Sequence, residues 1–189
     1  MKQFTHFRLA LIVAFLFFFS SLAQAADQVV TTNANSGAGS LSQAITDVTD
    51  GGSITFNLSA GNETITIASG IAITKAMTIN GDNTSGSGVA VTVKVTTPGT
   101  SAWRLLTITA SGSTINIQNM TMLGGNTGGD YGGVIRINSG ATVNLSSITM
   151  SNGKSNYGGG VFLTGATTNL IVTNSTLSNN STTSMHGGW

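Results

Sequence analysis

Side chains able to do acid–base, metal or redox chemistry are scarce in this sequence. Of 189 residues only 7% are charged, two are His and none is Cys. Within the repetitive part of the chain, Asp130 and Arg136 are the only oppositely charged residues close in sequence. Because one carboxylate cannot act as both general acid and general base, we interpret Asp130 as a solvated loop residue and Arg136 as a strand-surface charge. We expect no catalytic residues, no metal site and no cofactor.

Two tyrosines are the candidate binding residues. Tyr131 and Tyr157 lie 26 residues apart in corresponding glycine-rich turns. They form a possible aromatic patch for a carbohydrate or protein partner; the alternative is that they cover the end of a coil. The segment around Tyr131, residues 124–133, does not have the Gly-Gly-x-Gly-x-Asp order of a calcium-binding repeat, because Thr127 occupies the fourth place.

Thr64 and Thr66 form a Thr-x-Thr pair of the kind that binds ice when it recurs on successive coils. The pair does not recur at the period of the repeats described below, so the sequence does not predict an ice-binding array.

The first 25 residues have the pattern of a secretory signal peptide. Lys2 and Arg8 precede an apolar run over 9–19, and Ala23–Ala25 supplies a small-x-small cleavage site. Eleven apolar residues at roughly 1.5 Å each cover only about half of a ~30 Å hydrocarbon core, which disfavours a retained anchor. We expect export, cleavage before Ala26, and no membrane span in the mature chain.

The charge balance excludes some partners. Seven Lys and Arg stand against six Asp and Glu, a formal charge of +1. Without Lys2 and Arg8, five basic residues face six acidic ones, a net charge of −1. This gives no basic footprint for nucleic acid.

Apolar residues alternate with Thr, Ser and Asn in short bursts from Ser53 onward, which is typical of half-buried strands. The alternating sets are Ile54/Phe56, Ile65/Ile67, Ile71/Ile73, Met77/Ile79, Val89/Val91/Val93/Val95, Ile115/Ile117, Met120/Met122, Val143/Leu145, Ile148/Met150 and Leu170/Val172. Gly, Asn, Ser and Asp separate them and favour tight turns.

A long period organises these strands. A Gly-Gly-apolar box recurs at spacings of 27 and 28, and its glycines are Gly132, Gly133, Gly159, Gly160, Gly187 and Gly188. Met122, Met150 and Leu177 recur at 28 and 27. This period predicts an all-β fold, a right-handed parallel β-helix with one coil per repeat. Antiparallel hairpins are the competing interpretation, but they do not require a fixed period.

Stacked coils, at ~4.8 Å per strand, should form columns of like residues. We expect Met122 above Met150 above Leu177, and Val134 above Val161. We also expect a side-chain ladder joining Asn152 to Asn179.

The segment before the strands predicts a short capping helix. Leu41, Ala44, Ile45 and Val48 follow helical spacing, Ser40 and Gln43 have capping-box spacing, and Gly51-Gly52 should end the element. We therefore divide the chain into a signal peptide (1–25), an N-terminal cap (26–52) and β-helix coils (53–189).

The third repeat stops just after its glycine box. We expect an incomplete solenoid whose last coil frays from about Leu170 or associates end to end with another copy.

The repeats resemble a known family. SGAGSLSQAI (36–45) is similar to the opening of many large bacterial β-helix surface proteins. The Gly-Gly-Val-Ile and Gly-Gly-Val-Phe boxes, with VTNSTLSNNS (172–181), resemble the GGAI and FxxN repeats of polymorphic outer-membrane protein passengers, although Met150 and Leu177 stand where that family has Phe. The resemblance implies an autotransported adhesin at the bacterial outer membrane.

Two functions follow as expectations. The first is a non-enzymatic secreted or surface-exposed module, an adhesin-like passenger or stalk that binds a protein or glycan at the cell surface. The alternative is the N-terminal part of a polysaccharide-active lyase or hydrolase whose site lies beyond Trp189. The scarcity of acid and base groups favours the first.

Overall fold

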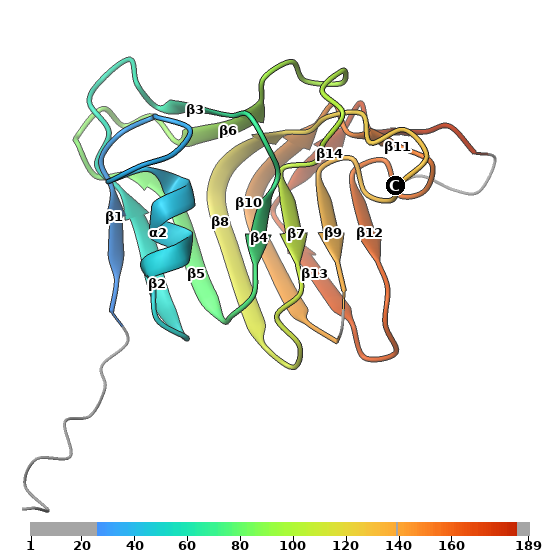
Figure 1. Ribbon diagram of the computed structural model, residues 1–189. Coiled ribbons are helices and arrows are strands. Elements are labelled where there is room, and N and C mark those ends of the chain that lie inside the picture. Colours follow the sequence, from blue (N-terminus) through green and yellow to red (C-terminus); the bar gives the residue numbers. More distant parts are fainter. Residues whose placement is uncertain (1–25, 139, 185–189) are drawn as a thin grey trace, which may run out of the picture.

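The chain folds as a parallel β-solenoid of about six turns, with 45% strand and 4% helix (Figure 1). The computed structural model describes residues 26–138 and 140–184. The all-β fold with stacked parallel coils is confirmed. The predicted signal peptide (1–25) and the Gly187-Gly188 box lie outside the described residues.

Parallel pairing between successive turns builds three sheets. The largest has the order β1-β2-β5-β8-β10-β13, and β3, β6 and β14 join it through β8 and β10. Its strands are β1 (Gln28–Val30), β2 (Gly52–Phe56), β3 (Thr64–Ile67), β5 (Met77–Asn83), β6 (Val91–Val95), β8 (Thr114–Leu123), β10 (Thr142–Ser151), β13 (Asn169–Thr173) and β14 (Thr176–Ser178).

The two smaller sheets close the other sides of the coil. One has the order β12-β9-β7-β4, and the other pairs β11 with β15. Their strands are β4 (Ile71–Ile73), β7 (Leu106–Ile108), β9 (Ile135–Ile137), β12 (Val161–Leu163), β11 (Lys154–Ser155) and β15 (Ser181–Thr182). The sheet β12-β9-β7-β4 positions the candidate site described below.

Two long strands bend from one side of the solenoid to the next. β8 bends at Asn119 (φ 56°) and β10 at Ser147 (φ 54°), both in the left-handed region. Asn adopts this conformation more readily than most residues. The Asn119 side-chain amide donates to Asn80 Oδ1 at 3.0 Å and to Asp82 Oδ2 at 2.9 Å, which fixes the bend.

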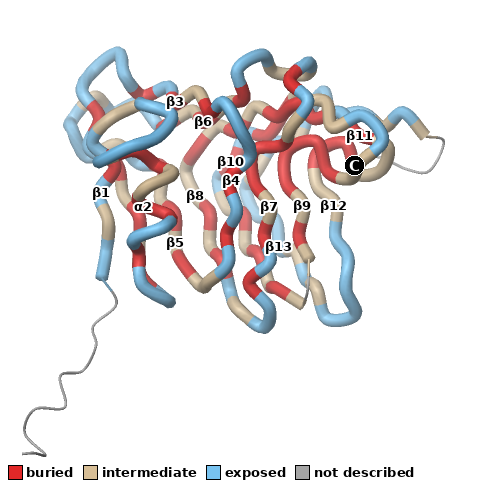
Figure 2. The backbone as a smooth tube through the Cα atoms, in the orientation of Figure 1, coloured by how far each residue is buried: buried red, intermediate tan, exposed pale blue. Residues whose placement is uncertain are grey.

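The interior consists of stacked apolar side chains, and Figure 2 colours the backbone of the buried residues red. The predicted column of Met122, Met150 and Leu177 is confirmed, since these residues are register partners in β8, β10 and β14. Val89 departs from the predicted strand pattern, because it precedes β6 and is 53% exposed.

The glycine boxes align one residue away from the predicted register. The Gly133 N–H donates to the Gly159 carbonyl at 2.8 Å, and Val161 pairs with Ile135 rather than stacking on Val134. Gly132 (φ 71°) and Gly158 (φ 61°) hold equivalent left-handed turns. The prediction that Gly133 corresponds to Gly160 is wrong, because successive coils are 26 residues apart at this corner and Gly133 therefore aligns with Gly159. Gly160 is the next residue along the chain and precedes β12.

The predicted side-chain ladder between Asn152 and Asn179 is also wrong, because a neighbouring residue makes the hydrogen bonds between the coils. Asn152 (φ 64°) and Asn179 (φ 55°) occupy equivalent left-handed corners, and the Asn152 amide donates to the Ser151 hydroxyl. Asn180 makes the inter-coil bonds instead: its Oδ1 accepts from the Gly153 N–H at 2.9 Å and its amide donates to the Met150 carbonyl.

Helix α2 (Leu41–Asp47) covers the core at the first coils. Leu41, Ala44 and Ile45 are buried, as predicted. The Ser40 hydroxyl accepts from the Gln43 N–H at 3.2 Å, which confirms the N-cap. The helix ends at Asp47, before Gly51-Gly52, and Gly52 begins β2.

The segment predicted as the cap also contributes a strand. β1 pairs in parallel with β2, so a first strand precedes the helix. In the last coil, Leu163, Ile171 and Val172 are 37%, 47% and 41% exposed. No helix within residues 26–138 and 140–184 is long and apolar enough to cross a membrane.

Candidate functional site: an aromatic and arginine surface

An outward-facing row of side chains crosses the sheet β12-β9-β7-β4. Ala72, Thr107, Arg136 and Phe162 are register partners on neighbouring strands. They alternate with inward residues such as Ile135 and Ile137, which are fully buried. At about 4.8 Å per strand the row is roughly 14 Å long, so it can contact an extended ligand lying along the solenoid axis.

Glycine turns place two tyrosines beside this row. An isolated parallel bridge joins Tyr131 to Tyr157, and their rings stack with centroids 5.4 Å apart and an interplanar angle of 18°. Phe162 adds a third ring, 4.6 Å from Tyr131. The structure therefore brings the predicted Tyr131/Tyr157 pair together, and both residues are half-buried.

A network of three charged residues adjoins these rings. Both Arg104 and Arg136 bind the Asp130 carboxylate, Arg104 at Oδ2 and Arg136 Nη1 at Oδ1. Arg136 Nε also donates to Asn138 Oδ1 at 3.1 Å, and its guanidinium lies 5.5 Å from the centre of the Tyr131 ring. Asp130 lies in a loop and Arg136 on the outer face of β9, as interpreted from the sequence, and the coil also brings the two residues into contact with each other and with Arg104.

The network keeps Asp130 ionised. Partial burial opposes ionisation, but the hydrogen bonds from Arg104 and the Tyr131 N–H and the positive charges of Arg104 and Arg136 outweigh it, so the pKa of Asp130 lies below its ordinary value. An ionised carboxylate with both oxygens bound to guanidinium groups is a poor general acid and a poor base at neutral pH.

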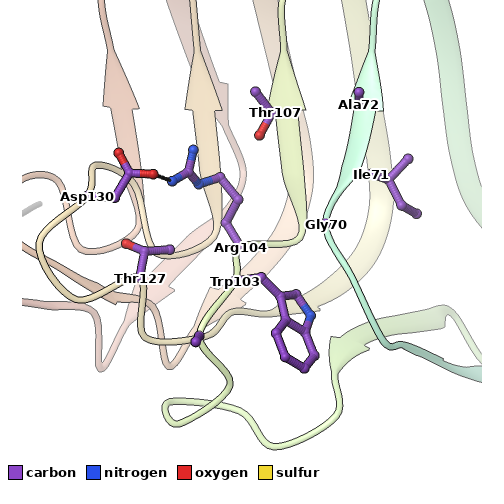
Figure 3. A pocket seen from close by; sticks show the side chains of 9 residues that line it. Gly70, Ile71, Ala72, Trp103, Arg104, Thr107, Thr127 and Asp130 are labelled. Atoms are coloured by element: carbon purple, nitrogen blue, oxygen red, sulfur yellow. Dashed lines mark hydrogen bonds and ion pairs between the residues drawn. The ribbon is translucent and has the colours of Figure 1, made fainter.

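An open pocket of about 280 Å³ lies beside the network. Its lining includes Ala72, Trp103, Arg104, Thr107, Thr127 and Asp130. Figure 3 shows the Arg104 side chain reaching from the loop before β7 to Asp130, with Thr107 and Ala72 on the adjacent strands. Arg104 is only 9% exposed, so the pocket wall includes a nearly buried cation.

Sequence reasoning missed Trp103 and Arg104. The usable signal was the coil length, since Arg104 precedes Asp130 by 26 residues, the same separation as Tyr131 and Tyr157. Residues one coil apart lie side by side in a solenoid, so charges distant in sequence, such as Arg104 and Asp130, can form an ion pair.

A second outward surface carries a threonine ladder. Thr64, Thr92, Thr121, Thr149 and Thr176 are successive register partners through β3, β6, β8, β10 and β14. The Thr64 position recurs at separations of 27 to 29 residues, so a fixed period of 27 or 28 does not find it. The Thr66 position continues as Lys94, Leu123, Ser151 and Ser178, so the Thr-x-Thr pair itself is not repeated.

Within the described ranges, no group of three or more His, Cys, Asp or Glu residues is placed to hold a metal ion. The aromatic and arginine surface presents aromatic rings, guanidinium N–H donors and hydroxyl groups.

Comparisons with protein-family models, with curated proteins and with solved structures found no match to this chain.

Proposed function

We propose that this chain is an exported, non-enzymatic β-solenoid module, adhesin-like in type, which binds a glycan at the bacterial surface. The β-solenoid is the stiff support, and the row on β4, β7, β9 and β12 with its neighbouring loops is the binding surface. The export and surface location rest on the signal-peptide pattern of residues 1–25, and the adhesin class rests on the likeness of its repeats to polymorphic outer-membrane passengers.

One observation carries the glycan proposal. The three rings of Tyr131, Tyr157 and Phe162 lie along the same face as the Arg104–Asp130–Arg136 network and the open pocket. Sugars present both apolar ring faces and many oxygen atoms, so a surface that alternates aromatic rings with guanidinium donors suits them. The elongated row suits a chain of sugars better than a compact ligand.

The state of Asp130 supports a binding role over catalysis. Both of its oxygens are engaged by guanidinium groups, and its lowered pKa leaves no proton to donate near neutral pH. We therefore assign Asp130 the role of holding the two arginines in position.

Binding to an array of bacterial and host glycans tests this proposal. The purified protein should bind a subset of glycans, and Tyr131→Ala should lose at least tenfold in affinity because it removes the central ring. Thr149→Ala, on the exposed threonine ladder, is the matched control and should bind as the unaltered protein does. Failure to bind any glycan, or equal binding by Tyr131→Ala, would contradict the proposal.

A further inference from the structure

The cluster beside the pocket carries an unbalanced positive charge. Arg104 and Arg136 share one carboxylate, and each oxygen of Asp130 already accepts from one of them. Two guanidinium groups and one carboxylate leave a net charge of +1. Because Arg104 is nearly buried, this charge is screened less by salt than an exposed one would be.

Two buried donors on residues that line the pocket have no acceptor, although the Trp103 ring points away from Arg104 and Asp130 (Figure 3). Among the described residues, neither Arg104 Nε nor the indole Nε1 of Trp103 has a hydrogen-bond partner, and both side chains line the pocket. A buried N–H without an acceptor is a destabilising feature, so an oxygen atom brought there by a ligand is favoured.

We propose that the pocket binds the carboxylate of an acidic sugar, such as a uronic acid or a sialic acid within a glycan. This inference rests on the proposed function and names the class of its ligand. A second carboxylate would balance the charge of the cluster and accept from guanidinium N–H groups, which bind carboxylates well because of their planar geometry.

The surroundings specify a sugar carboxylate rather than a small organic acid. Thr107 lies next to Arg136 in the outward row and lines the pocket, so it offers a hydroxyl group to the same ligand. Phe162 follows Arg136 on the next strand, at a spacing of about 4.8 Å. A carboxylate at the arginines therefore places the adjoining sugar ring over the aromatic side chains.

Titration calorimetry with paired probes tests the inference. The acidic probes are a uronic acid trisaccharide and sialyllactose; the neutral ones are the methyl ester of that trisaccharide and lactose. We expect at least one acidic probe to bind tenfold or more tightly than its neutral partner, and its affinity to fall as salt is raised. The acidic probe that binds identifies the source of the carboxylate.

Two charge variants locate the site. Arg136 is partly exposed, so Arg136→Gln should keep the melting temperature of the fold while losing about tenfold in affinity for the acidic probe, a larger loss than for the neutral one. Lys94→Gln, which removes a charge from β6 on another sheet, is the control and should change neither.

Each outcome separates the two proposals. Equal binding of acidic and neutral probes overturns the carboxylate inference and leaves the glycan-binding function in place. Unchanged acidic binding by Arg136→Gln, with the unaltered protein binding normally, also overturns it. If the unaltered protein binds none of the four probes, the carboxylate inference is overturned, and the glycan array decides the broader function independently.

Discussion

The glycine turn that places Tyr131 beside Tyr157 should tolerate no side chain. Gly132 has φ 71°, and a Cβ added to it would overlap the carbonyl oxygen of Ile135. Its N–H donates to the Tyr157 carbonyl at 2.9 Å. Gly128, in the same loop, has a similar φ of 61°, but a Cβ added there would meet nothing within 4 Å. The two glycines therefore separate the cost of the backbone conformation from the cost of the overlap.

The expected magnitudes follow from these contacts. A left-handed non-glycine residue costs about 1–2 kcal/mol, which applies to both Gly128→Ala and Gly132→Ala. Only Gly132→Ala must also shift the backbone and weaken the hydrogen bond to Tyr157, a further ~0.5–1.5 kcal/mol or more. We expect the free energy of unfolding to fall by about 1–2 kcal/mol in Gly128→Ala and by about 1.5–3.5 kcal/mol or more in Gly132→Ala.

Urea unfolding followed by far-ultraviolet circular dichroism measures this difference, with equal slopes required for the comparison. Near-ultraviolet circular dichroism should also show a weaker tyrosine signal in Gly132→Ala, because the ring stack depends on this turn. If the two variants unfold within about 0.5 kcal/mol of each other, the close approach of Gly132 to the Ile135 carbonyl is refuted.

Three further predictions address the core, the ion network and export. Met150→Ala, inside the solenoid, should cost about 2–5 kcal/mol in urea unfolding, whereas Leu163→Ala in the exposed last coil should cost under about 1 kcal/mol; similar losses would contradict the stacked core. The lowered pKa of Asp130 contributes stability that is complete above the ordinary value of 3.8 and is lost as pH falls through the native value. Asp130→Asn should abolish that part of the acid dependence of the melting temperature, and an unchanged profile would contradict it. Mass spectrometry of the exported protein should find Ala26 at its N-terminus, and a retained leader would contradict the signal-peptide prediction.

The architecture was predictable from sequence because a solenoid repeats its core. Column positions such as Met122, Met150 and Leu177 must hold similar apolar residues, since each packs on the equivalent residue of the next coil. The register was less predictable, because coil length varies around the ring. The coil length is 26 residues from Ile135 to Val161 but 28 from Met122 to Met150. Aligning Gly133 with Gly160 therefore places this corner one residue out of register.

The candidate site was predictable only where it follows the repeat. The 26-residue spacing indicated that Tyr131 and Tyr157 lie in equivalent turns, and the structure places them side by side. Trp103 and Arg104 belong to an irregular loop before β7, where the 26-residue separation of Arg104 from Asp130 gives the one signal noted above. The ion network therefore required the structure, because it joins this loop to Asp130 in the following turn.

Hydrogen–deuterium exchange with and without a bound glycan tests the central claim most directly. The account predicts that a glycan selected on the array slows amide exchange in residues 103–107, 130–136 and 157–163, and leaves the threonine-ladder strands unchanged. Protection confined to other segments, with binding intact, would contradict the assignment of the aromatic and arginine surface as the binding site.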